Sequence, residues 1–403
     1  MSTSLLYHAF GLRGYRYLST SYFEGDVVFR VDPKPEEFRC SVCGSREVIR
    51  RGSVLRTLRT VPIGGKGVLI VVEVPRLGCV CGAVRQAELG CAEPRRRHTK
   101  AFARYALELL RSMTIQDVAR HLQVGWDTIK EIQRQYLQQR FGRPKLKHLR
   151  HLAIDEISIG HGHRYLTVVL DLDSGAVVFV SEGKSAESLL PFWRRLRSSR
   201  AKIKAVAMDM SAAYISAVRD YLPDAVIVFD HFHVIKLMNE KLSDLRREMY
   251  REAIDKLHKD VLKGTRWLLL KHPENLDTER NEPQRLQEAL RLNQPLATAY
   301  YLKEDLAQFW EQPHKRAARN FLTSWCLRAM DSGIRVMQQM AKTLLFHAEG
   351  LLAWYDYPIS TGPLEGTNNK IKTMQRQAYG FRDHEFFKLK IYGIHETKYA
   401  LVG

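Results

Sequence analysis

The stretch that most constrains the fold runs from Leu152 to Ser181, where three apolar segments follow one another at short intervals. These segments, "LAIDEISIG", "YLTVVLDL" and "AVVFVSE", are rich in β-branched and aromatic residues, which favour strands. Asp173-Ser174-Gly175, between the second and the third, is a turn signal. Three strands joined by short turns predict an antiparallel meander.

Acidic residues occur within or directly after the apolar segments of this region. Asp155 lies in the first segment, and two later segments, "IKAVAMDMS" and "AVIVFDHFH", carry Asp209 and Asp230. A carboxylate beside an apolar core has to be paired or bound to a metal. One such acid alone would more simply cap a strand end that faces water, but a series of them indicates a shared site.

The order strand, strand, strand, helix, strand, helix, strand is that of a ribonuclease-H-like α/β domain, in which the first and fourth strands lie side by side. Asp155 and Asp209 would then meet at adjacent strand ends. Two carboxylates held so close repel each other unless a divalent cation lies between them. A third carboxylate is expected on a later helix, where Pro363 is a natural first helical residue and Glu365 falls in the first turn.

The helix predicted to begin at Pro363 carries its chemistry on one face. Acid, amide and cation recur at helical spacing and could hold a scissile phosphate; a solvated charged face is the alternative. The residues concerned are Glu365, Asn368, Asn369, Lys372 and Arg376. The apolar positions that would bury the helix are sparse: Leu364, Ile371 and Met374.

Five motifs in this chain resemble those of bacterial insertion-sequence transposases of the DDE type, in the ISL3 group with an N-terminal zinc ribbon and a helix-turn-helix. The motifs are "AIDE", "MDMSAAY", "DHFHVIK", "GPLEGTNNKIK" and "YGFRDHEFFKLKI". The resemblance covers most of the chain. It implies Asp155, Asp209 and Glu365 as the catalytic triad that binds magnesium or manganese.

The resemblance also implies a reaction and its partners. Two metal ions would activate the nucleophile and stabilise the leaving oxygen, first in hydrolysis at the ends of the element and then in strand transfer. The partners would be double-stranded DNA, as terminal inverted repeats and target, and further copies of the chain in a homodimer or higher homo-oligomer. Possible auxiliary residues are Asp230, His233, Asn369 and Lys372. The rival interpretations are a nuclease or junction resolvase without strand transfer, and a domesticated, non-catalytic DNA-binding regulator.

Two closely spaced cysteine pairs predict a metal site near the N-terminus. Cys40 and Cys43 precede Gly44, Cys79 and Cys81 precede Gly82, and the segment between the pairs alternates like strands around Gly64-Gly65. Four thiolates on two tight turns suit structural zinc. The alternative is two unrelated thiol pairs, with Cys91 and His98 as spare ligands.

A basic region from Glu93 to Arg150 predicts DNA binding. Thr114 begins a short helix in the manner of a capping box, and "QVG" separates this helix from "WDTIKEIQRQYL". Short helix, tight turn and longer helix make a helix-turn-helix, whose second helix enters the major groove. A generic helical hairpin is the alternative, and Gln123 occupies a turn position that usually holds glycine. The expected DNA contacts are Thr128, Lys130, Glu131 and Arg134, and on the later helix Lys370, Lys372 and Arg376.

The charge balance supports a polyanionic partner. Lys and Arg number 63 against 44 Asp and Glu, a net charge of +19, and phosphate neutralisation releases condensed counterions. No apolar run reaches the ~20 residues of a membrane span and no signal peptide opens the chain, so we expect a cytoplasmic, nucleoid-associated protein with reduced cysteines.

The predicted organisation interrupts the catalytic domain with a helical insertion, because helical patterns extend over roughly a hundred residues after the strand that ends at Asp230. The first long helix of this insertion is expected over Lys236–Lys256. The predicted domains are 1–92 (β region with zinc ribbon), 93–140 (helix-turn-helix), 141–150 (basic linker), 151–235 (catalytic, first part), 236–355 (helical insertion) and 356–403 (catalytic, last part).

Overall fold

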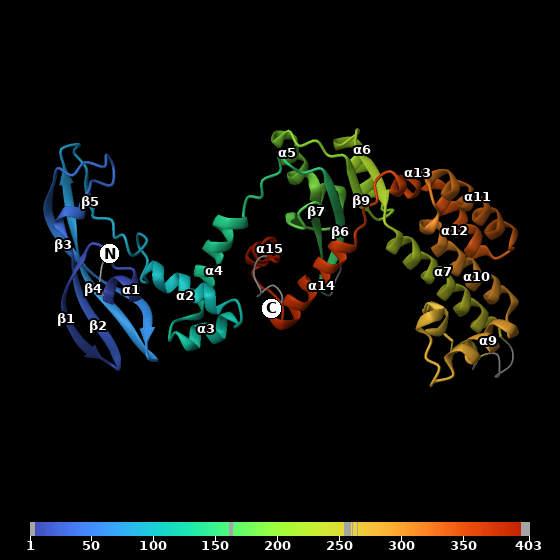
Figure 1. Ribbon diagram of the computed structural model, residues 1–403, viewed down its shortest axis with the longest axis horizontal. Helices are drawn as coiled ribbons and strands as arrows, with labels where there is room; N and C mark the ends of the chain where they lie inside the picture. Colours follow the sequence, from blue (N-terminus) through green and yellow to red (C-terminus); the bar gives the residue numbers. More distant parts are fainter. Residues whose placement is uncertain (1–4, 161–163, 254–258, 260, 264, 396–403) are drawn as a thin grey trace. The chain divides into compact units, whose positions relative to one another are not determined.

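The computed structural model describes residues 5–160, 164–253, 259, 261–263 and 265–395 (Figure 1). The chain forms two compact units. One combines Met1–Arg143 with Thr373–Gly403, and the other is Pro144–Lys372. No helix in the described ranges is both long and apolar enough to cross a membrane.

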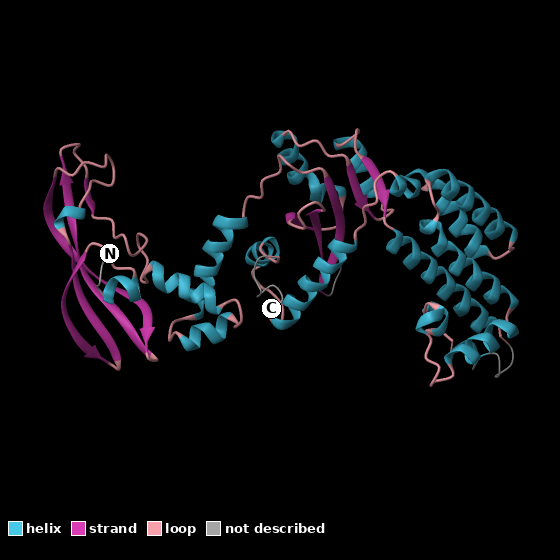
Figure 2. Cartoon of the chain, in the orientation of Figure 1, coloured by secondary structure: helices cyan, strands magenta, loops and turns pink. Residues whose placement is uncertain are grey.

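The N-terminal part of the first unit is a five-stranded sheet (Figure 2). Its order is β1-β2-β4-β3, with β5 paired to β4, and only β2 and β4 run parallel. The predicted turn at Gly64-Gly65 joins β3 to β4, and both glycines have positive φ. The elements are α1 (Leu5–Phe10), β1 (Tyr15–Phe23), β2 (Asp26–Pro33), β3 (Val48–Ile63), β4 (Lys66–Cys79) and β5 (Val84–Gln86).

Three helices follow in the same unit: α2 (Lys100–Leu109), α3 (Ile115–His121) and α4 (Trp126–Phe141). The Thr114 hydroxyl accepts the backbone N–H of Asp117 at 3.1 Å and donates to its carboxylate at 2.7 Å, which confirms the predicted cap of α3. Gln123 has φ +54°, the left-handed conformation that its turn position demands. The predicted short helix, tight turn and longer helix are therefore present.

Helix α15 (His384–Tyr392) packs on these helices, which differs from the predicted domain 356–403. Phe386 and Leu389 of α15 share an apolar core with Ile129, Ile132 and Leu137 of α4. Burial of large apolar side chains favours this pairing, and residues from Thr373 onward belong to the first unit.

The second unit is built on a sheet of order β10-β9-β6-β7-β8. The meander β6-β7-β8 is antiparallel, and β9 pairs with β6 and with β10 in parallel, so the predicted neighbours are confirmed. The Asp173-Ser174-Gly175 turn is also present, with Gly175 at φ +74°. The elements are β6 (His151–Gly160), β7 (Arg164–Asp171), β8 (Val177–Glu182), α5 (Leu190–Ser199), β9 (Ala205–Met208), α6 (Ala212–Tyr221) and β10 (Val226–Phe229).

The helices between β10 and the last helix of this unit form the predicted insertion (Figure 1). The first of them begins at His231, directly after Asp230, rather than at Lys236; the end of the expected Lys236–Lys256 helix lies outside the described residues. The elements are α7 (His231–Glu252), α9 (Glu282–Leu292), α10 (Gln294–Ala307), α11 (Lys315–Asp331), α12 (Arg335–Phe346) and α13 (Ala348–Leu352). Short 3₁₀ turns occur at Pro35–Glu37, Ala186–Leu189, Leu268–Leu270, Pro273–Asn275, Gln308–Glu311 and Ala353–Tyr355.

Helix α14 (Gly362–Gln377) follows the insertion and carries Glu365 in its first turn. Leu364, Ile371 and Met374 are fully buried, so the three apolar positions seen in the sequence do anchor the helix. Asn368 lies on the same buried face, whereas Lys372 is exposed.

Candidate functional site

The register of the central strands brings Asp155 and Asp209 together. In the parallel pair β6-β9, Leu152 is opposite Val206 and Ala153 is opposite Ala207. Two residues further along each strand the same register leads to Asp155 and Asp209. The two acids, distant in sequence, are therefore neighbours because of main-chain pairing.

Several carboxyl groups lie close together at this partly buried edge of the sheet. Burial raises the pKa of Asp155, and the Asp209 carboxylate raises it further, whereas His233 and the backbone N–H of Glu156 act in the opposite direction. Burial also raises the pKa of Glu156, together with the charges of Asp209 and Asp155. The Asp209 carboxylate thus disfavours the ionised forms of both Asp155 and Glu156.

The donors and acceptors around Asp155 suit a hard cation. Asn368 of α14 donates to one carboxylate oxygen of Asp155 at 2.8 Å, and the backbone N–H of Glu156 donates to the other at 2.8 Å. The buried atoms Oδ1 of Asn368 and Oε2 of Glu156 have no hydrogen-bond partner. Oxygen atoms from carboxylates and amides are the ligands that Mg²⁺ and Mn²⁺ prefer, so these residues fit a divalent cation.

Glu365 is half-buried and its helix is anchored at the same edge. Its backbone N–H donates to the carbonyl of Thr361 at 2.8 Å, and the Thr361 hydroxyl donates to Asp230 at 2.7 Å. Asp230 is almost completely buried; burial acts to raise its pKa, but the imidazole of His231, 3.6 Å away, and the hydrogen bond from Thr361 hold the pKa below its usual value. Asp230 thus fixes the start of α14.

The remaining predicted residues lie around this edge in different ways. His233 is close enough to act electrostatically on both Asp155 and Asp230. Asn369 and Lys372 are exposed on α14, Lys370 is half-buried, and Arg376 is exposed. Within the described ranges, only the four cysteines bring three or more ligand atoms of His, Cys, Asp or Glu within 4.8 Å of one another. Asp155, Asp209 and Glu365 are not gathered that tightly.

The cysteine pairs form a separate site in the N-terminal sheet. The Sγ atoms of Cys40 and Cys81 are 3.7 Å apart and those of Cys43 and Cys79 are 3.5 Å apart, with all four within 4.8 Å. Four sulfurs at ~2.3 Å from a tetrahedral zinc would lie about 3.8 Å from one another. These distances fit a zinc ion and are too long for disulfides.

The backbone favours the thiolate of Cys40, the form that binds a metal. Backbone N–H groups of Cys43 and Val42 lower the pKa of Cys40 to about 6. Gly44 and Gly82 follow the two pairs at φ +75° and +83°, which lets each turn close on its cysteines. The spare candidate Cys91 instead donates to the Tyr15 hydroxyl at 3.3 Å.

Three family descriptions match successive parts of the chain. "Transposase" matches residues 152–391, "Helix-turn-helix domain of transposase family ISL3" matches 87–137, and "zinc-finger of transposase IS204/IS1001/IS1096/IS1165" matches 36–81. The chain is a DDE-type transposase of the ISL3 family.

Curated relatives agree with this assignment. The transposase for insertion sequence element IS1001 of Bordetella parapertussis is 35% identical over 363 residues, covering 89% of each chain. The transposase for insertion sequence element IS1557 of Mycobacterium tuberculosis is 29% identical over 382 residues, covering 88% of this chain and 85% of that protein. A chain of the Drosophila P element transposase strand transfer complex matches at a TM-score of 0.35 and 11% identity, over 64% of this chain and 77% of that one. A likeness that weak supports no argument.

The transposase binds DNA through its helix-turn-helix, and the structure places the predicted contacts on α4 unequally. Lys130 is 2.8 Å from the carboxylate of Asp383, and Arg134 pairs with the same carboxylate. Their hydrogen bonds lower the pKa of Asp383 to about 2, against the effect of burial. Thr128, Lys130 and Arg134 all line a hollow of about 530 Å³, together with Arg95, Arg96 and Arg97, but Thr128 is not part of the ion pairs with Asp383.

Two residues at this carboxylate edge were not assigned a role from the sequence. Glu156 stands next to Asp155 in "AIDE", and the signal for it was present as a second acid in a buried strand. The sequence placed Asn368 only on the same helical face as Glu365 and did not reveal its partner. Its bond to Asp155 depends on how α14 meets β6, which the helical period alone does not reveal.

Proposed function

We propose that this transposase binds the terminal inverted repeats of its insertion sequence and cleaves and joins DNA strands at a site formed by Asp155, Asp209 and Glu365. The observation that carries the proposal is the β6-β9 register, which leads to Asp155 and Asp209 as neighbours. Burial and the neighbouring Asp209 carboxylate raise the pKa of Asp155, and a divalent cation between the two acids would relieve this effect.

A magnesium or manganese ion held by these carboxylates would activate a nucleophilic oxygen and stabilise the leaving oxygen. The protein's own groups do the positioning. Asn368 orients the Asp155 carboxylate, and Asp230 with Thr361 fixes the helix that presents Glu365. His233, Asn369 and Lys372 act as auxiliaries around the reacting phosphate. Lys370 and Arg376, on the same helix, contact the DNA backbone.

DNA is held by the first unit. Thr128 and the arginines at residues 95–97 share one hollow, so we assign phosphate contacts to that place. Lys130 and Arg134 are both paired with the Asp383 carboxylate, so that only part of their positive charge is available to DNA. Because an insertion sequence has two ends and each chain has one such triad, we infer that a homodimer or higher homo-oligomer acts on DNA.

The test is a nicking assay on a duplex that carries the repeats flanking the coding sequence. In magnesium or manganese the wild type should nick at the repeat end, and Asp155→Asn should reduce the rate by at least about a hundredfold, since a misplacement of ~1 Å alone costs that much. A gel shift of the same duplex should be unchanged. A wild type that cuts only branched DNA would favour the resolvase interpretation and overturn the proposal.

A further inference from the structure

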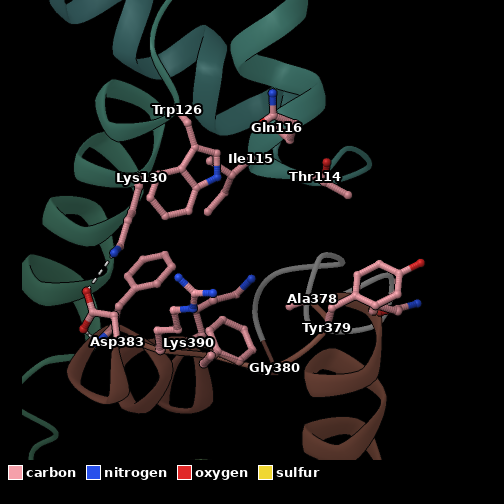
Figure 3. Close-up of a pocket in the computed structure, with 14 residues that line it drawn as sticks. Thr114, Ile115, Gln116, Trp126, Lys130, Ala378, Tyr379, Gly380, Asp383 and Lys390 are labelled. Carbon is pink, nitrogen blue, oxygen red and sulfur yellow. Dashed lines mark hydrogen bonds and ion pairs between the residues drawn. The ribbon is translucent and has the colours of Figure 1, made fainter.

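A cavity of about 650 Å³ lies beside the first turn of α4, within the first unit (Figure 3). It is lined from one side by Trp126 and Lys130 of α4, and from the other by the segment that leads from α14 into α15, including Tyr379, Phe381 and Arg382. Lys390 of α15 completes its floor. None of the residues assigned to the zinc site or to the carboxylate edge lines it.

Aromatic rings stand open at this cavity. Trp126, the first residue of α4, is 41% exposed, and Tyr379 is fully exposed. Tyr379 also has φ +51°, a left-handed conformation that costs a bulky residue free energy. No burial of its ring offsets this cost. A strained and exposed aromatic residue at the mouth of a cavity is the arrangement of a stacking platform.

Positive charge lies among the rings. The ammonium of Lys130 is 4.9 Å from the centre of the Trp126 ring, and that of Lys390 is 5.5 Å from the centre of the Phe381 ring. Lys390 is only 4% exposed, and this burial lowers the pKa of its ammonium. Asp383 also lines the cavity and neutralises Lys130, so Arg382 supplies the permanent cation there. The rings and this guanidinium together match a ligand that has both a flat π-face and a phosphate.

The position of the cavity selects the ligand. In a helix-turn-helix, the first residues of the second helix meet the base edges of the bound duplex. Trp126 and Lys130 belong to this part of α4, so DNA bound there passes next to the cavity. The volume lies in the range of about 300–1,000 Å³ of small-ligand pockets, which admits one nucleotide and no duplex.

We propose that this cavity receives one unpaired base of the DNA that α4 holds, stacked on Trp126 or Tyr379 with its phosphate facing Arg382. The proposal rests on the proposed binding of terminal repeats by the helix-turn-helix. It assigns a ligand to the "YGFRD" segment, which the catalytic edge does not use. Taking a base out of the stack costs energy, and stacking on the aromatic residues returns part of it.

The experiment measures the affinity of the full chain for fluorescein-labelled repeat duplexes by anisotropy. One series carries a single unpaired thymine, moved one position at a time; the other carries an abasic residue at the same places. We expect one position at which the unpaired thymine binds about tenfold more tightly than the fully paired duplex, with no gain for the abasic residue. Tyr379→Ala and Trp126→Ala should each reduce this gain.

Matched variants separate stacking from folding. Tyr379→Phe keeps the ring and should keep the gain, and Tyr22→Ala, which removes a largely exposed ring from the N-terminal sheet, should not change it. Equal affinity for paired and unpaired duplexes at every position would overturn the inference, and so would an equal gain for the abasic residue. The proposed function is tested by a separate comparison, that of the repeat with a scrambled duplex. Equal affinity for these two duplexes would overturn the proposed function, whatever the difference between paired and unpaired duplexes.

Discussion

The two candidate metal sites of this transposase differ in how far the folded chain completes them. The four cysteines place all their sulfur atoms within 4.8 Å of one another, close to the spacing around a tetrahedral zinc. Asp155 and Asp209 come from neighbouring strands and Glu365 from α14, whose Asn368 bonds to Asp155, and the three acids are not gathered that closely. The four cysteines could by themselves complete the coordination of a zinc ion, whereas the carboxylates would leave coordination positions free.

The origin of the ligands explains the difference. Each cysteine pair lies on one tight turn, and main-chain bonds such as that from Gly44 to Cys40, at 2.9 Å, set the spacing locally. The carboxylates come from two strands and a helix and repel one another when ionised. Structural sites are saturated by protein ligands, whereas catalytic sites keep positions for water and substrate. The following predictions test this contrast.

The largest effect is expected from Cys40→Ser combined with Cys43→Ser. Loss of half the ligands should abolish zinc binding, which in structural sites contributes about 10–16 kcal/mol of apparent free energy. Zinc measured by mass spectrometry of the purified protein should fall from about one ion per chain to none, and the N-terminal sheet should become sensitive to protease. Cys91→Ala serves as the control and should keep the zinc. Unchanged zinc content in the double variant would contradict the assignment.

A smaller but still large effect is expected from Glu365→Gln, which keeps the size of the side chain and removes its charge. Cleavage and strand transfer should fall at least about a hundredfold, while zinc content and repeat binding stay at wild-type values. Glu349→Gln and Asp356→Asn are the controls, because these acids are in ion pairs with Arg319 and Lys315 on the surface. If Glu365→Gln cut DNA at the wild-type rate, Asp230 would be the next residue to test.

The smallest effect is expected from Thr361→Val. The variant removes the hydroxyl that donates to buried Asp230 and should cost about 1–3 kcal/mol of unfolding free energy, because a buried carboxylate oxygen loses its donor. Cleavage should fall about tenfold. Thr323→Val removes a hydroxyl from an exposed position of α11 and should change stability by no more than about 0.5 kcal/mol in urea denaturation. Equal losses of unfolding free energy in the two variants would show that the hydroxyl of Thr361 does not stabilise the fold more than an exposed one does.

The sequence predicted those features that depend on local pattern. Strand segments and turns gave the order of the catalytic sheet, and the parallel pairing of β6 with β9 followed from the fold that this order indicates. The spacing of the cysteines predicted their cluster, and Thr114 predicted the start of α3. In each case a few neighbouring residues carry the free energy that decides the structure.

Features that depend on contacts between distant segments were not predictable in this way. Asp383 pairs with Arg134, 249 residues away in the sequence, and neither residue's neighbours reveal the other. The packing of α15 on α4 is a choice among many apolar faces of similar hydrophobicity. Asn368 contacts Asp155 only because Thr361 and Asp230 fix where α14 begins.

The hydrogen bond between Asp230 and Thr361 has a consequence for how such enzymes diversify. The chain leaves the catalytic sheet at Asp230 and returns at Thr361, and the two side chains meet at 2.7 Å. The two ends of the helical insertion are therefore adjacent in space. An insert with adjacent ends can grow, shrink or be exchanged without displacing its host. The length of the helical insertion could therefore vary while Glu365 keeps its place, except in its last segment, where Ala353 packs with Ala205 and Val228 of the sheet.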